Sequence, residues 1–188
     1  VGYNCGIRPA VEPGDVAVVI GDGMVGQWAA QTLAHRGAEV TVLGRHDERL
    51  ALLPSPIRSY NLRRGELADW IGDRRDIAVV VDTVGAMGTF RKLKPAMKLN
   101  SHLVSAGFLG TEGTVDIQEL RPQEITLHSP SGWTTPRMDA TLEGIREGWL
   151  RTTPLITHRF KAEDAEKAWR KIMDKEGFFL GIVLEWNK

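Results

Sequence analysis

The 188-residue chain carries balanced charge, with 24 Lys and Arg residues against 24 Asp and Glu residues. Balanced charge gives no net basic field to gather nucleic acid, so a small-molecule ligand is favoured over a polynucleotide. The single cysteine, Cys5, excludes an intramolecular disulfide and a cysteine-rich zinc site, which is typical of a reducing compartment. No apolar stretch reaches the length of a membrane span and no signal peptide opens the chain, so we expect a soluble, cytoplasmic protein.

The first predicted elements form a strand, a glycine-rich turn and a helix. A continuous apolar run over residues 16–20 reads as a buried parallel strand, and Gly21-Asp22-Gly23-Met24-Val25-Gly26 follows it directly. The Ala-rich residues 27–36, closed by Gly37, then read as a helix. With a second strand over residues 39–43, these segments form a βαβ unit of about thirty residues, which is the context in which a G-x-G-x-x-G predicts dinucleotide binding.

Each part of the turn has an expected role at a pyrophosphate. Gly21 makes the tight turn, Gly23 lets the backbone approach the phosphates, and Gly26 lets the helix pack close to the strand. The free N–H groups at the helix start, around Met24 and Val25, attract phosphate. We expect the Asp22 side chain to point away from the phosphates. The alternative is a purely structural turn in an α/β protein.

The rest of the first 150 residues alternates strands with helices. Further strands are predicted at residues 56–60, 77–81, 103–105 and 124–128, with helices marked by Leu67, Trp70 and Ile71 and by Phe90, Leu93 and Met97. This rhythm predicts a Rossmann fold, a doubly wound six-stranded parallel sheet with helices on both faces. Ligands of such sheets lie beyond the carboxyl ends of the strands, at the turns 21–26, 44–46, 82–86 and 106–109.

The C-terminal part has a different pattern. Spacing predicts a helix with Met138, Leu142, Ile145 and Trp149 on one face, and another with Ala165, Ala168, Trp169 and Ile172 on one face. Residues 157–160 read as a short loop between them, and residues 178–184 form a last apolar run. We therefore divide the chain into a dinucleotide-binding domain at residues 1–150 and a C-terminal segment at residues 151–188.

Several motifs together resemble the medium-chain dehydrogenase/reductase family, in particular the cofactor-binding half of zinc-type alcohol dehydrogenases. They are Pro13-Gly14-Asp15, the glycine turn, Asp82-Thr83-Val84-Gly85, Val104-Ser105-Ala106-Gly107, Ile156-Thr157-His158-Arg159-Phe160, Ala162-Glu163-Asp164-Ala165 and Ala168-Trp169. The resemblance implies an oxidoreductase that transfers hydride between an alcohol or ketone and NAD(P). It also implies that the segment from about Phe178 returns toward a catalytic domain and pairs with it, and that dimers form through the sixth strand, residues 124–128.

In that family a separate N-terminal domain supplies the zinc ligands and the proton relay. This sequence starts at Val1 without a methionine and holds neither, so we expect a fragment that binds dinucleotide and is inactive alone. The five histidines have no Cys or Glu partner at ligand spacing, so we expect no metal site here and no catalytic residue; zinc would come only from the missing domain.

The end of the second predicted strand bears on the choice of cofactor. NAD-preferring enzymes carry an acidic residue there that binds the ribose hydroxyls, whereas this chain has Gly44, followed by Arg45. Arg45, helped by His46 and Arg49, is a candidate clamp for the 2′-phosphate of NADP. The alternative is a solvated loop in which Asp47 and Glu48 offset these charges.

Two further turns carry weaker signals. Val84 and Gly85, and Ala106, Gly107 and Phe108, lie where the family places backbone contacts to the adenosine ribose and the nicotinamide. Alternatively, these glycines only allow tight strand exits. Competing functions are a zinc-free quinone or enone reductase of the same family, and a non-catalytic module that senses the dinucleotide.

Overall fold

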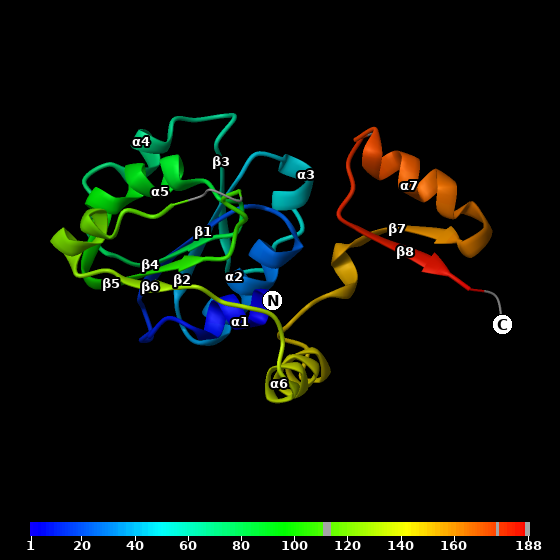
Figure 1. The fold of residues 1–188 in the computed structure, drawn as a ribbon, viewed down its shortest axis with the longest axis horizontal. Coiled ribbons are helices and arrows are strands. Elements are labelled where there is room, and N and C mark those ends of the chain that lie inside the picture. Colours follow the sequence, from blue (N-terminus) through cyan, green and yellow to red (C-terminus); the bar gives the residue numbers. More distant parts are fainter. Residues whose placement is uncertain (111–113, 176, 187–188) are drawn as a thin grey trace. The chain divides into compact units, whose positions relative to one another are not determined.

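The computed structural model describes residues 1–110, 114–175 and 177–186, and the chain divides into two compact units, Val1–Leu150 and Arg151–Lys188 (Figure 1). Among the described residues, no helix combines the length and the apolar composition that crossing a membrane requires.

The first unit is built on one six-stranded parallel sheet. Its strand order is β3-β2-β1-β4-β5-β6, and every neighbouring pair is parallel. The strands are β1 (Val16–Ile20), β2 (Glu39–Gly44), β3 (Arg58–Asn61), β4 (Ile77–Asp82), β5 (Met97–Ser105) and β6 (Thr126–His128). The predicted Rossmann architecture is confirmed.

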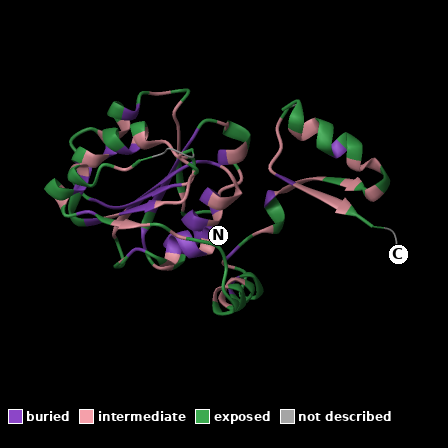
Figure 2. Ribbon diagram, in the orientation of Figure 1, coloured by how far each residue is buried: buried purple, intermediate pink, exposed green. Residues whose placement is uncertain are grey.

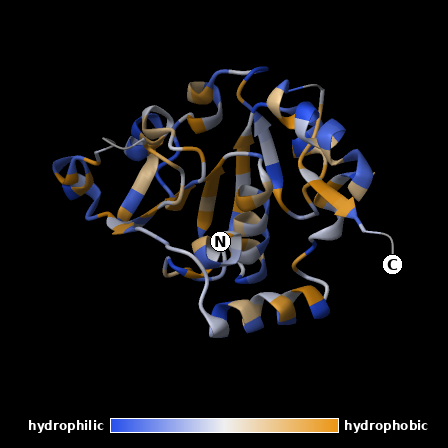
Figure 3. Cartoon of the chain, turned by 45° about the vertical axis from the view of Figure 1, so that its right-hand side comes forward, coloured by the Kyte–Doolittle hydropathy of each residue, from blue (hydrophilic) through white to orange (hydrophobic). Residues whose placement is uncertain are grey.

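Helices cover both faces of this sheet. The helices of the first unit are α1 (Gly2–Ile7), α2 (Met24–His35), α3 (Asp47–Leu50), α4 (Leu67–Ile71), α5 (Met87–Leu93) and α6 (Thr135–Arg146), with the 3-10 helices η1 (Lys94–Ala96) and η2 (Ile117–Gln123). Alternate residues of β1 point to opposite faces, so Ala17 and Val19 pack with α2 in one core while Val18 and Ile20 pack with α5 in another. Figure 2 shows the central strands buried, and Figure 3 shows them as largely hydrophobic.

The second unit is a small βαβ arrangement. Strands β7 (Ile156–Lys161) and β8 (Gly181–Glu185) pair in parallel, and α7 (Ala165–Met173) connects them, with the 3-10 turns η3 (Thr153–Leu155) and η4 (Ala162–Asp164) before and after β7. The prediction of a loop at residues 157–160 is wrong. This polar segment becomes a strand because the apolar β8 supplies a partner backbone, with Arg159 opposite Val183. Pairing of β8 with a further domain stays a prediction.

Three element ends also differ from the sequence prediction. Helix α2 begins at Met24, so the last three residues of the glycine motif lie in its first turn. Met97 opens β5 and does not close the preceding helix. Trp149 lies beyond α6 and stacks on His35 of α2, with ring centroids 4.0 Å apart, so its helical spacing was coincidental.

Candidate functional site

Four strand exits lie together at the carboxyl edge of the sheet. Ile20 at the end of β1 pairs with Leu43 of β2 and with Asp82 of β4, and Asp82 in turn pairs with Ser105 at the end of β5. The four turns that follow these strands are the ones expected to bind a ligand, and the sheet brings them to one edge. The sheet order reverses direction between β1 and β4, which is where ligands of such folds bind.

The three glycines of the turn are required for different reasons. Gly21 has a φ of 117° and donates its amide to Leu43 O at 2.9 Å, and a Cβ on it would collide with Thr83 Oγ1. A Cβ on Gly26 would collide with the carbonyl of Gly21. A Cβ on Gly23, by contrast, would meet no atom within 4 Å. The fold therefore requires Gly21 and Gly26, while Gly23 borders open space.

Gly23 also caps the N-terminus of α2. The amides of Met24, Val25 and Gly26 are in the first turn of this 12-residue helix, where the helix offers no acceptor, and the Gly23 cap has no side chain to supply one. The aligned peptide dipoles add partial positive charge at this end. An anion beside Gly23 would satisfy these donors.

Asp22 links the glycine turn to the loop after β2. Its Oδ2 accepts hydrogen bonds from Arg45 N at 2.7 Å and from His46 N at 2.9 Å, and lies 3.0 Å from His46 Nδ1. Arg49 Nη1 lies 3.5 Å from Asp22 Oδ1. Burial alone would raise the pKa of Asp22, but the hydrogen bonds from Arg45 and His46 and the charge of His46 lower it overall, so the carboxylate is ionised at neutral pH.

The three basic residues expected to clamp a phosphate therefore differ in their surroundings. His46 and Arg49 face the Asp22 carboxylate. Arg45 is exposed, and its guanidinium makes no hydrogen bond or ion pair with the described part of the chain. The Asp22 side chain points toward the loop after β2, and its expected orientation away from the phosphates stays a prediction.

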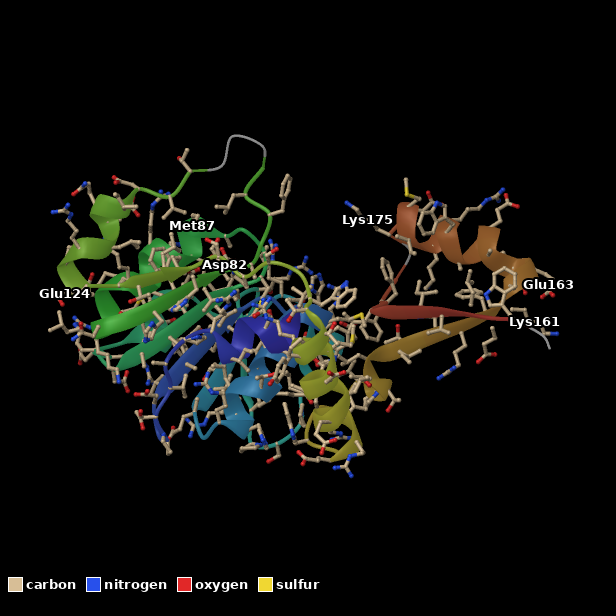
Figure 4. The ribbon with its side chains drawn as sticks, turned by 60° about the horizontal axis from the view of Figure 1, so that its bottom comes forward. Asp82, Met87, Glu124, Lys161, Glu163 and Lys175 are labelled. Atoms are coloured by element: carbon tan, nitrogen blue, oxygen red, sulfur yellow. The ribbon has the colours of Figure 1, made fainter. Side chains whose placement is uncertain are left out.

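Asp82 organises the other two turns. Its backbone carbonyl accepts the amides of Ala106 and Gly107, each at 2.8 Å, and its Oδ1 accepts those of Val84 and Gly85, each at 2.9 Å. Gly85 has a φ of 84°, and a Cβ on Gly107 would overlap the Gly85 amide. These glycines are thus required by a close backbone contact between the two turns. Figure 4 shows Asp82 at the exit of β4 and Met87 in the helix that follows.

Two apolar side chains project from these turns. Phe108 is 80% exposed and Val84 is 47% exposed, although both are large hydrophobic residues. Exposure of this kind beside the glycine turn is typical of a surface that contacts a ligand or another part of a protein.

Sequence reasoning missed two buried residues of this edge, Gln27 and Asp82, as contributors to the site. Gln27 is fully buried, and its Nε2 donates to Arg49 O at 2.8 Å and to Asp22 O at 3.3 Å. Asp82 had a visible signal, since a carboxylate ends an otherwise apolar strand. Nothing in the sequence marked Gln27 within its helix.

Metal-binding side chains do not cluster in the part of the chain that the structure describes. No group of three or more His, Cys, Asp or Glu residues there is arranged to hold an ion. His102 and His128 form a pair with 3.1 Å between Nδ1 and Nε2, and His35 stacks on Trp149. Zinc, if the whole protein uses it, stays a prediction of the resemblance.

No protein-family model matches the chain. Among curated proteins, it is 24% identical over 180 residues to L-threonine 3-dehydrogenase from Burkholderia multivorans, covering 93% of the chain and 52% of that enzyme. The chain therefore spans about half the length of the curated relatives that it matches.

Solved structures show the same fold. The 2R,3R-butanediol dehydrogenase from Bacillus subtilis matches all of the chain with a TM-score of 0.84 and 17% identity, over 55% of its own length. Zinc dependent alcohol dehydrogenase 2 from Streptococcus pneumonia matches with a TM-score of 0.81 and 21% identity, over 56% of its length. The aligned proteins are dehydrogenases, and the likeness extends through both units of the chain.

Proposed function

We propose that the chain is the dinucleotide-binding portion of an oxidoreductase that transfers hydride between an alcohol or carbonyl substrate and a nicotinamide cofactor. The observation that carries this proposal is the glycine turn, in which Gly23 borders open space at the N-terminus of α2. A glycine that the fold does not need, placed beside free helix amides, is what close approach of a pyrophosphate requires.

We assign the adenosine ribose and the nicotinamide of the cofactor to the surrounding turns. In this proposal the amides of Met24, Val25 and Gly26 hold the pyrophosphate, while the loop after β2 lies at the adenosine ribose. The turns at Val84 and Gly85 and at residues 106–108 lie toward the nicotinamide. The continuous edge formed by β2, β1, β4 and β5 supports this order.

The direct test is Gly23→Val. A side chain at this position fills the space that the phosphates need, so dinucleotide binding should be lost, whereas the fold should be retained because a Cβ there meets nothing. Gly132→Val is the matched control, since a Cβ on Gly132, in the loop before α6, also meets nothing within 4 Å. Calorimetric titration with unchanged circular dichroism measures both expectations. Parent-like binding by the Gly23 variant would place the phosphate site elsewhere.

For the cofactor itself, we propose a preference for NADP. Gly44 supplies no carboxylate at the end of β2, and the exposed guanidinium of Arg45 next to it has no hydrogen-bond or ion-pair partner among the described residues. A guanidinium there fits the 2′-phosphate, because it donates charge-assisted hydrogen bonds to phosphate oxygens.

Arg45→Ala tests this preference. Loss of one charged hydrogen bond at an exposed site should weaken NADP binding by about tenfold and leave NAD binding nearly unchanged. Arg121→Ala, an exposed arginine of η2, controls for the general loss of positive charge. Equal weakening of both cofactors by Arg45→Ala, or a parent protein that prefers NAD, would contradict the assignment.

Substrate binding and catalysis remain to be assigned, because the chain matches only about half of each relative. The matched relatives carry the names of threonine, butanediol and alcohol dehydrogenases, which supports an alcohol or carbonyl substrate. A separate domain would supply the zinc and the proton relay. Dimerisation through β6 and a cytoplasmic location stay predictions. Turnover of an alcohol by the whole protein would exclude a module that only senses the dinucleotide.

A further inference from the structure

Residues 22 and 44 compete for one space at the end of β2. A Cβ built on Gly44 would lie 2.6 Å from Asp22 Oδ2, 2.7 Å from Asp22 Cβ and 2.7 Å from Leu50 Cδ2. The Leu50 methyl can rotate away, but Asp22 Cβ moves only with its backbone. Gly44 is therefore glycine because Asp22 already fills the place of its side chain.

The Asp22 carboxylate in this space is held by protein groups. It is 6% exposed, and its oxygens face two backbone amides, the His46 ring and the Arg49 guanidinium. A carboxylate at the end of β2 would ordinarily accept hydrogen bonds from ribose hydroxyls. Here its acceptor capacity is used to fix the backbone of the loop.

Of the three basic residues in this loop, only Arg45 has a side chain that does not contact Asp22. His46 and Arg49 both lie against Asp22, so the Asp22 carboxylate offsets the positive charge of Arg49 and occupies the His46 ring as a hydrogen-bond partner. Arg45 is anchored through its backbone N–H only, which leaves its guanidinium outside the cluster. The loop thus presents Arg45 from a fixed backbone position.

Gln27 adds two hydrogen bonds to this arrangement. Its buried Nε2 donates to the backbone carbonyls of Asp22 and Arg49. These hydrogen bonds hold the backbone of the two residues whose side chains form the ion pair. The glycine turn and the loop after β2 consequently form one connected unit around the Asp22 carboxylate.

We propose that Asp22 is a positioning residue that sets the choice between the two nicotinamide dinucleotides. By filling the space at position 44 and holding the backbone of Arg45 and His46, it withholds a carboxylate from the ribose hydroxyls and presents Arg45 to a 2′-phosphate. This inference rests on the proposed function, of which it deepens the cofactor choice.

A double-mutant cycle on the full chain tests whether Asp22 acts through Arg45. The variants are Asp22→Asn, Arg45→Ala and their combination, titrated with NADP and NAD and with the fragments adenosine 2′,5′-bisphosphate and 5′-AMP. Asp22→Asn should weaken both 2′-phosphorylated ligands by about fivefold and change NAD and 5′-AMP by less than about twofold. In the Arg45→Ala background, the same substitution should have an effect below about twofold on every ligand.

Other outcomes of the cycle would overturn the proposal. A merely structural role for Asp22 would weaken all four ligands together and would persist in the Arg45→Ala background. Tighter NADP binding by Asp22→Asn would mean that the carboxylate repels the phosphate and does not position its partner.

Exchange of the two residues provides the second test. Gly44→Asp alone should lower the thermal unfolding temperature, because the new side chain collides with Asp22. Asp22→Gly combined with Gly44→Asp should recover most of that loss and prefer NAD, since a free carboxylate then stands at the end of β2. A Gly44→Asp single variant as stable as the parent would show that the space is not shared and would overturn the inference.

Different results contradict the proposed function and the role of Asp22. A parent protein that binds neither dinucleotide defeats the proposed function. A parent that binds NADP, with Asp22→Asn and Arg45→Ala showing independent effects, defeats only the role of Asp22.

Discussion

At the scale of single residues, two glycines of the turn are required by the fold and the third is not. Collisions force Gly21 and Gly26 to lack a side chain, whereas Gly23 has room for one. Gly23 differs from other glycines with room for a side chain, such as Gly132, because it borders the N-terminus of α2, whose first amides have no acceptor within the helix. Gly23 is for this reason a more informative residue than its two neighbours in the motif.

Cys5 gives a prediction at the same scale. The side chain is fully buried in α1, and burial raises the pKa of its thiol to about 11. Because the thiolate is the reactive form, only about one thiol in a thousand would be ionised at about pH 8. Alkylation by iodoacetamide should therefore be very slow in the folded protein and fast in denaturant. Native labelling at the rate of a free cysteine would show that α1 opens readily.

The sequence allowed the position of the glycine motif to be predicted, but not the partners of its side chains. The Asp22 side chain faces the loop after β2. That it binds residues 45 and 46 depends on β1 and β2 lying side by side, which brings together groups more than 20 positions apart. The space that Asp22 and a side chain at position 44 would share also depends on this strand pairing. It cannot be predicted from the residues around either position.

At the scale of elements, continuous apolar runs predicted the buried strands. Residues 16–20 and 77–81 are apolar throughout and lie within β1 and β4, because strands covered on both faces need apolar side chains along their length. The polar segment 157–160 carried no such signal. It forms a strand only because β8 pairs with it, and such pairing partners are not visible in a local window.

The pairing of β5 with β6 places His102 against His128. Burial lowers the pKa of His102, with Lys98 acting in the same direction and Asp15 opposing it. Burial also lowers the pKa of His128, and the charges of His102 and Arg8 add to this. The folded protein therefore resists protonation of both rings more than the unfolded chain does, whose histidines titrate near pH ~6.5.

This difference predicts how stability depends on pH. As the pH falls below about 6.5, the unfolded chain binds more protons than the folded one. The two neutral histidines therefore contribute to stability above that pH, and this contribution is lost as the pH falls toward their lowered pKa values in the folded protein. Thermal unfolding temperatures between about pH 7.5 and pH 5.5 should fall less in His128→Gln than in the parent. His158→Gln, in the second unit, is the control. An equal fall in the parent and in His128→Gln would assign the pH dependence to other groups.

At the scale of the whole molecule, the chain matches about half of each dehydrogenase that it resembles. The first unit brings together the turns that we propose bind the dinucleotide, and Asp82 connects two of them by accepting four backbone hydrogen bonds. In the described residues, no cluster of metal ligands accompanies them. That cofactor binding and substrate chemistry reside in different parts of the protein stays a prediction of the family resemblance.

Cofactor binding is tested by calorimetric titration of the 188-residue chain with NADP and, separately, with NAD. We predict saturable binding at one site per chain, tighter for NADP, with no alcohol oxidation by the chain alone. The absence of binding of either dinucleotide at millimolar concentration would contradict the central claim that the glycine turn is a cofactor site.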